Sequence, residues 1–207
     1  EGQEDIKTIP ATGGKKWYLW AGIGVGIVAV LALVWVFFLK NGTSATSEEP
    51  IRPPTAEEKQ KSAEKIEAAI RKTIKKPKGV LAPRDRKKVS ELELWDLSIY
   101  DLAALSGLEK LKKLDLVGNH INDLTPLANL KNLEDLALDR NQVNDLSALS
   151  GLSKLKTLGL EANRITDLTP LAQLKQLNSL QLKDNPRLTK AQVQTLQQAL
   201  PGCKIDS

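Results

Sequence analysis

The chain has 207 residues, which is enough for one modest domain with additional segments. It contains one histidine and one cysteine, which excludes most combinations of catalytic or metal-binding side chains and any internal disulfide bond. The net charge of +5 is unevenly distributed. Residues 52–90 hold 13 Lys and Arg against 5 Asp and Glu, whereas residues 91–207 hold 13 against 15. The basic character therefore belongs to one segment.

Residues 17–39 are an uninterrupted run of uncharged, mostly apolar residues, which follows a polar segment at 1–16 that we expect to be a flexible tail. A helix of this length reaches roughly 34 Å, enough to cross a hydrocarbon core of about 30 Å. Lysines bound the run, and Trp and Phe residues lie near both of its ends. A cleaved signal peptide would be shorter and would end at a small-residue cleavage site. We therefore expect one transmembrane helix over residues 17–39.

Gly22, Gly26 and Ala29 place small residues on one face of this expected helix. Small residues let a second membrane helix approach closely, because helix association in lipid depends on packing contacts. Glycine is also simply common in membrane helices. A helix-packing role and no specific role are both compatible with the pattern.

Residues 40–54 are small, polar and rich in proline, which predicts a linker. Thr55 and Glu58 then have the spacing of a capping box, so a helix should begin here and form a basic, helical N-terminal cap over residues 55–90. The apolar stripe that we expect to face the core of the protein consists of Ala63, Ile66, Ile70 and Ile74.

The basic helix allows two interpretations. Its apolar stripe could cover the open end of a repeat domain, which would otherwise expose its first layer of leucines. Its basic residues, within 59–88, could instead contact anionic lipid head groups, and the two roles are compatible. No aromatic residues alternate with the lysines to stack on bases, so we expect no nucleic-acid partner.

Residues 91–185 repeat with a period of 22. Each repeat carries a pair of leucines two residues apart, as in Leu114 and Leu116, an arrangement typical of a short strand with both leucines facing inward. Asparagines recur in register, and a buried amide can satisfy backbone groups of the loops. These are Asn119, Asn141, Asn163 and Asn185, with Leu97 at this position in the first repeat.

Aspartates also recur in register, each before a Leu-Thr-Pro-Leu or Leu-Ser-Ala-Leu segment. They are Asp101, Asp123, Asp145 and Asp167. We expect each to cap a helical turn on the convex side of the repeats. A row of metal-binding carboxylates is the less favoured alternative. We predict no metal and no cofactor.

The frame L-x-L-x-x-N-x-I-x-D-L-x-P-L resembles the 22-residue class of leucine-rich repeats found in bacterial internalins and in phosphatase-regulator-type proteins. The end of the chain, residues 186–207, is similar to the C-terminal cap of many bacterial members. The resemblance implies an α/β fold: a solenoid of short parallel strands and helical or 3-10 turns between helical N- and C-terminal caps. It also implies protein–protein recognition, usually across the concave sheet.

The register of the strands predicts which side chains face outward on the concave sheet. Most are small or charged and would be solvated, whereas Trp95 is a candidate anchor for a partner or could pack under the N-terminal cap. The candidate protein-binding residues are Trp95, Val117, Asp139, Arg140, Glu161 and Lys183.

No nucleophile–base pair or metal set is available, so we expect a non-enzymatic protein. The first functional hypothesis is a membrane-anchored accessory subunit of a larger membrane protein complex. The second is a cell-surface or periplasmic receptor or adhesin that binds a separate protein. The lysines before residue 17 favour a bacterial inner-membrane orientation with the N-terminus in the cytoplasm and the repeats outside, while the basic segment 52–90 favours the reverse.

Overall fold

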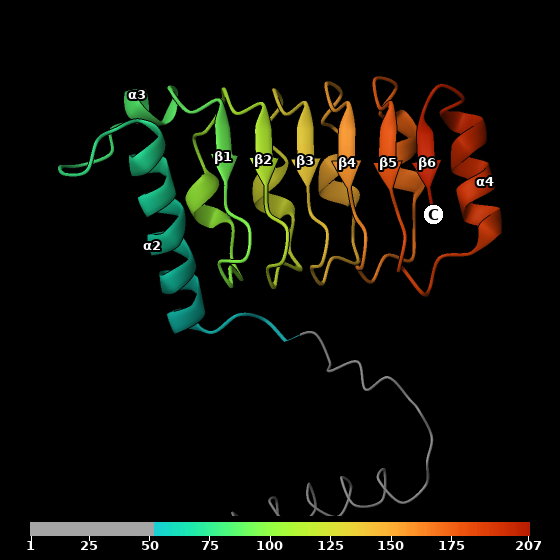
Figure 1. The fold of residues 1–207 in the computed structure, drawn as a ribbon, viewed down its shortest axis with the longest axis horizontal. Helices are drawn as coiled ribbons and strands as arrows, with labels where there is room; N and C mark the ends of the chain where they lie inside the picture. The colour runs from blue at the N-terminus through green and yellow to red at the C-terminus, as the bar shows by residue number, and fades with distance from the viewer. Residues whose placement is uncertain (1–51) are drawn as a thin grey trace, which may run out of the picture. The chain divides into compact units, whose positions relative to one another are not determined.

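Six three-residue strands form one parallel sheet in the computed structural model, which describes residues 52–207 (Figure 1). Their order in the sheet is their order in the chain. Leu92, Leu114 and Leu136 lie opposite one another, so each step from β1 to β5 is one 22-residue repeat, whereas β6 pairs with β5 after 25 residues. The strands are β1 (Glu91–Glu93), β2 (Lys113–Asp115), β3 (Asp135–Ala137), β4 (Thr157–Gly159), β5 (Ser179–Gln181) and β6 (Lys204–Asp206). The predicted repeat solenoid is confirmed.

Short 3-10 helices close the first four coils on the side of the core away from the sheet. The core between these two layers is formed almost entirely by leucine, with an isoleucine or valine in each turn. Stacking buries the apolar residues of each coil against its neighbours, which no single coil could do alone. The 3-10 helices are η1 (Ala103–Leu105), η2 (Thr125–Leu127), η3 (Ser147–Leu149) and η4 (Thr169–Gln173).

The recurring asparagines are buried and join neighbouring coils, as predicted. Asn141 Oδ1 accepts the N–H of Ile121 at 3.0 Å, and its Nδ2 donates to the carbonyls of Leu116 and Leu138 at 2.9 and 3.0 Å. Equivalent bonds are made by Asn119, Asn163 and Asn185. Each amide therefore satisfies backbone groups of its own coil and of the preceding one.

The recurring aspartates cap the N-terminal ends of the 3-10 helices. Each accepts, at 2.8 Å, the N–H of the residue two positions later, which is the first residue of the helix. The donors are Ala103, Thr125, Ser147 and Thr169. The predicted capping role of Asp101, Asp123, Asp145 and Asp167 is confirmed.

Helix α2 (Ala56–Thr73) packs against β1 and η1 at one end of the sheet. It begins with the predicted capping box, and Ile66 and Ile70 are completely buried. The predicted stripe is wrong at one position, because Ala63 is exposed and Ser62 is buried instead. Ser62 Oγ donates to the Glu58 carbonyl at 2.6 Å and accepts the Tyr100 N–H at 3.0 Å. Its hydroxyl can be buried because both bonds are made.

Helix α3 (Pro83–Arg86) follows α2 and contains a buried carboxylate. Asp85 accepts hydrogen bonds from Lys76 Nζ at 2.6 Å and from the Ala82 N–H at 3.1 Å. The ammonium of Lys76 is the main cause that lowers the pKa of Asp85 to about 2. This contact fixes the segment that follows α2 to α3.

Helix α4 (Lys190–Ala199) and strand β6 complete the other end of the sheet. Thr189 and Gln192 form a second capping box, and Leu196 and Leu200 contribute to the core. Both ends of the leucine core are thus covered by elements that belong to residues 52–207.

The predicted tail, the predicted membrane helix with Gly22, Gly26 and Ala29, and all of the predicted linker except residues 52–54 lie outside the described residues. Within residues 52–207, no helix combines the length and the apolar character needed to cross a membrane.

Candidate functional site

One side of the sheet carries no covering element among the described residues. We call it the open face and define it by the outward positions of the strands and of the residues that continue them. It consists of Glu91, Glu93, Trp95, Lys113, Asp115, Val117, Asp135, Ala137, Asp139, Thr157, Gly159, Glu161, Ser179, Gln181, Lys183, Lys204 and Asp206. Backbone bonds from Leu94 to Asp115 and from Asp96 to Val117 extend the ladder beyond the strands.

The open face is acidic and hollowed. Seven of its residues are Asp or Glu and three are Lys. A shallow hollow of about 260 Å³ extends over the sheet from β1 to β5, and the small residues Ala137 and Gly159 line it. Four carboxylates and one ammonium group also belong to it, those of Glu91, Glu93, Asp115, Asp135 and Lys113. The hollow therefore has room for side chains of a partner and is lined by more negative than positive groups.

Trp95 is the one large apolar residue of the open face that is strongly exposed. Its exposed fraction is 55%, so it does not pack under α2, the alternative that the sequence left open. It lies two residues beyond Glu93, and side chains two residues apart along an extended strand share a face.

Glu93 and Asp115 lie directly opposite each other on β1 and β2. Like charges at such a position destabilise a sheet. The neighbouring pair, Glu91 and Lys113, has opposite charges, with 4.0 Å between carboxylate and ammonium. The uncompensated pair is therefore Glu93 with Asp115, beside Trp95.

The other predicted protein-binding residues differ in how exposed they are and in whether their side chains already have a partner within the domain. Val117 is half-buried, and Lys183 forms an ion pair of 2.8 Å with Asp206. The expectation that Asp139 faces solvent is wrong in part, because its carboxylate accepts the N–H of Glu161 at 2.7 Å. Arg140 is exposed, but it lies at a turn rather than on the ladder and has a positive φ of 56°.

Arg140 belongs to a column of left-handed residues that sequence reasoning missed. The column follows the strands β1 to β5 at the 22-residue period and comprises Asp96, Gly118, Arg140, Ala162 and Asp184. A glycine at every repeat would have been the signal, but only one of the five is a glycine. At Gly118 an added Cβ would lie 1.9 Å from Asp96 Oδ1, so glycine is required there for space as well.

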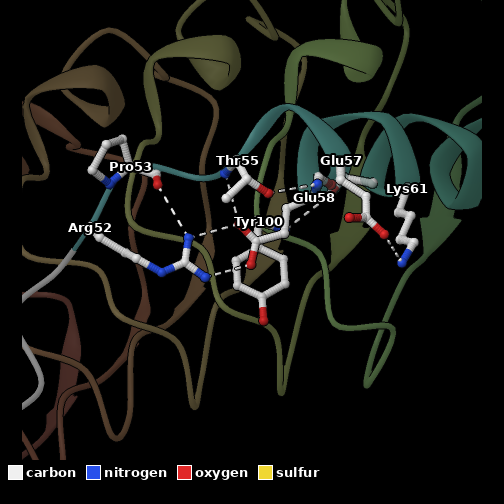
Figure 2. Close-up of polar contacts among 8 residues, drawn as sticks. Arg52, Pro53, Thr55, Glu57, Glu58, Lys61 and Tyr100 are labelled. Carbon is white, nitrogen blue, oxygen red and sulfur yellow. Dashed lines mark hydrogen bonds and ion pairs between the residues drawn. The ribbon is translucent and has the colours of Figure 1, made fainter. Parts of the chain in front are cut away.

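The start of α2 holds a second polar cluster (Figure 2). The Arg52 guanidinium contacts both carboxylate oxygens of Glu58, at 2.6 and 2.8 Å, and the Thr55 N–H donates to the same carboxylate at 2.7 Å. The hydrogen bond from Arg52 is the main cause that lowers the pKa of Glu58 to about 2. The cluster fixes residues 52–55 to the helix.

Chemically reactive groups are scarce in the described part of the chain. Burial raises the pKa of the Cys203 thiol, which favours the unreactive protonated form. His120 stacks on Tyr100 with 4.6 Å between ring centroids. Residues 52–207 contain no group of three or more His, Cys, Asp or Glu side chains that could hold a metal ion.

A sheet with one uncovered face, built from stacked 22-residue coils, defines a leucine-rich repeat protein. The family model described as "Leucine-rich repeat and WD repeat-containing protein 1, LRR" matches residues 101–205, just over half of the chain. The chain belongs to this leucine-rich repeat family.

Two solved structures are similar to the described domain. An internalin from Listeria monocytogenes is 28% identical, with a TM-score of 0.64, over 68% of this chain and 41% of the internalin. A leucine-rich repeat protein of Leptospira interrogans is 31% identical, with a TM-score of 0.56, over 62% of this chain and 34% of its own. The chain thus spans less than half of either protein. A comparison with curated protein sequences gives no match.

Leucine-rich repeat domains of this kind are typically non-enzymatic. The family match and the internalin-like fold indicate a module for protein–protein interaction.

Proposed function

We propose that this chain is a non-enzymatic, membrane-anchored interaction module that acts as an accessory subunit of a larger membrane protein complex. The observation that carries the protein-binding role is the open face, an uncovered sheet surface with Trp95 exposed at one end. Tryptophan is enriched among the residues that dominate binding energy at protein interfaces.

In this proposal, the membrane anchor of the chain is the apolar run 17–39. Gly22, Gly26 and Ala29 would provide the face on which a helix of another subunit packs. Replacing Gly22 and Gly26 by leucine should therefore release the chain from the complex without preventing membrane insertion. Val25→Leu with Val28→Leu changes other positions of the run and is the matched control.

Anionic lipid would contact the basic end of the domain, within residues 59–88. Several cationic side chains there make no ion pair or hydrogen bond with the described part of the chain, and Val80, two residues after Lys78, is 86% exposed. Basic residues next to an exposed apolar one suit an anionic membrane surface. These cations are Lys59, Lys72, Lys75, Lys78 and Arg84.

We place the N-terminus in the cytoplasm and the repeats outside a bacterial inner membrane, following the lysines that precede residue 17. Protease treatment of sealed inside-out and right-side-out vesicles tests this orientation. Cleavage of the domain only in right-side-out vesicles is the expected result, and cleavage only in inside-out vesicles reverses the orientation.

Native electrophoresis after mild detergent extraction tests the accessory-subunit role. The chain should migrate in a discrete large complex, whereas migration as a free monomer would favour a receptor that binds its partner separately. Thr157→Arg projects a bulky cation from the exposed centre of the open face and should release the chain. Gln173→Arg, on exposed η4, is the matched control and should leave the complex unchanged.

A further inference from the structure

We infer that the segment docked on the open face is basic, and that the corner formed by Glu93, Asp115 and Trp95 holds one of its cationic side chains. The inference rests on the proposed protein-binding role of this face and specifies the chemistry of the partner. It concerns a surface that the described part of the chain leaves uncovered.

The first reason is charge. The open face has seven carboxylates and three ammonium groups, although residues 91–207 as a whole are nearly neutral. The imbalance is greatest in the hollow, where Lys113 is the one cation among four carboxylates. Potentials at protein interfaces are complementary, so a cationic segment is favoured and an acidic one is repelled. The same argument disfavours nucleic acid and anionic lipid on this face.

The second reason is the like-charge pair of Glu93 and Asp115. The two residues are opposite each other in register, and no cation of the described residues forms an ion pair with either. Asp115 Oδ1 accepts the Val117 N–H at 3.0 Å, so that oxygen is held in place. An arginine or lysine of a partner, placed between the two carboxylates, would replace their repulsion by two attractions.

The third reason is Trp95. It shares the face of Glu93 two residues away and is more than half exposed. The face of an indole ring attracts a guanidinium or ammonium group. Two carboxylates and an aromatic ring side by side suit the planar cation of arginine better than a neutral side chain.

The test is fluorescence polarisation of the full chain in mild detergent with three labelled peptides of equal length. They alternate glycine with arginine, serine or glutamate. The arginine peptide should bind and the other two should not. Glu93→Gln with Asp115→Asn should weaken binding about tenfold, since losing a hydrogen bond to a charged group costs about this factor or more. Trp95→Ala should weaken it further.

A matched control removes two carboxylates elsewhere. Glu57→Gln with Glu109→Gln causes the same change in net charge, and both carboxylates are exposed and remote from the open face. This variant should bind the arginine peptide as the unchanged chain does. Equal weakening by both double variants would mean non-specific attraction and would overturn the inference. Failure of the arginine peptide to bind would also overturn it.

The inference and the proposed function can fail separately. If the arginine peptide does not bind but Thr157→Arg still releases the chain from its complex, the partner chemistry is wrong and the binding face is right. If the arginine peptide does not bind and Thr157→Arg also leaves the chain in its complex, both the partner chemistry and the open face as the binding surface are wrong. Residues 52–90 of a second copy are a competing basic occupant. Light scattering of the chain tests for such a dimer. If a dimer forms, and if Glu93→Gln with Asp115→Asn dissociates it, the occupant of the open face is a second copy of this chain and not a separate partner.

Discussion

Asn141 illustrates how a single side chain connects the coils. Its amide bonds Ile121 and Leu116 of the preceding coil and Leu138 of its own. Asn141→Ala would leave the buried Ile121 N–H without a partner, at about 1–3 kcal/mol. The carbonyls of Leu116 and Leu138 would each lose one of two bonds and keep those from Asn119 and Asn163. Urea unfolding of the domain should therefore show a large loss of stability.

Asp139 provides the comparison for Asn141. Its bond to the Glu161 N–H makes Asp139→Ala destabilising by about 1 kcal/mol, not neutral as for a solvated residue. Asp139→Asn keeps an oxygen acceptor and should lose less. A loss from Asp139→Ala as large as that from Asn141→Ala would contradict the roles assigned to both residues.

Gly118→Ala should destabilise the domain by more than about 1 kcal/mol. The backbone there is left-handed, with φ of 70°, and the new Cβ would collide with Asp96 Oδ1. Gly202→Ala is the control, since no atom lies within 4 Å of its Cβ position. In thermal melting, Asp96→Ala should rescue the part of the Gly118→Ala loss that comes from the collision. Equal melting temperatures for the two glycine variants would refute this geometry.

At the level of single residues, the sequence predicts those roles that are carried by a chemically specific residue type recurring at the repeat period. Asn141 and Asp123 recur in register with one role each, and both roles are confirmed. The left-handed column was missed because Arg140 and Ala162 carry no signal for a positive φ. The bond of Asp139 depends on where the next coil places its N–H, which a strand pattern does not specify.

Helix α2 shows what sequence can predict about an element. Its start was predicted from Thr55 and Glu58, and its contact with the core from Ile66 and Ile70. The orientation of the stripe was wrong by one residue, because hydrophobicity favours Ala63 over Ser62. A tertiary hydrogen bond from the Tyr100 N–H, together with the local bond to the Glu58 carbonyl in the same helix, satisfies the Ser62 hydroxyl and overrides that preference.

Removing α2 and α3 should expose the first coil. A fragment of residues 55–207 should be folded and monomeric, whereas residues 91–207 would expose Leu92 and Leu94 and should melt at a lower temperature or aggregate. Circular dichroism and light scattering measure both properties. Identical melting temperatures would mean that α2 does not stabilise the solenoid.

Acid should weaken the N-terminal end of the domain. Contacts with Arg52 and Thr55 lower the pKa of Glu58 from 4.5 to about 2, and Lys76 lowers that of Asp85 from 3.8 to about 2. The unfolded chain therefore binds protons at higher pH than the folded one. The stabilisation is complete above the ordinary pKa values and is lost as the pH falls towards 2.

Thermal melting of the domain with Arg52 included, from pH 6 to pH 2, tests this dependence. Glu58→Gln with Asp85→Asn should flatten the profile in the acid range while lowering the melting temperature near pH 6. A profile unchanged by the substitutions would show that other carboxylates control acid unfolding.

Charge divides the whole described domain into distinct surfaces. The segment with α2 and α3 is strongly basic, whereas the open face is acidic. Such a separation orients a charged partner during its approach and makes association sensitive to salt. The repeat period predicted the sheet and its outward residues, but not the half-buried state of Val117 or the exposure of Trp95, which depend on the packing of the first coils.

The most direct measurement of the central claim is site-specific photo-crosslinking on intact membranes that contain the native chain. A photoreactive residue at Thr157 samples the open face, and one at Gln173 samples the opposite side of the core. We predict a discrete crosslinked protein from Thr157, lost when Trp95→Ala is added, and none from Gln173. Crosslinks from Gln173 alone, or equally from both positions, would contradict the open face as the binding surface.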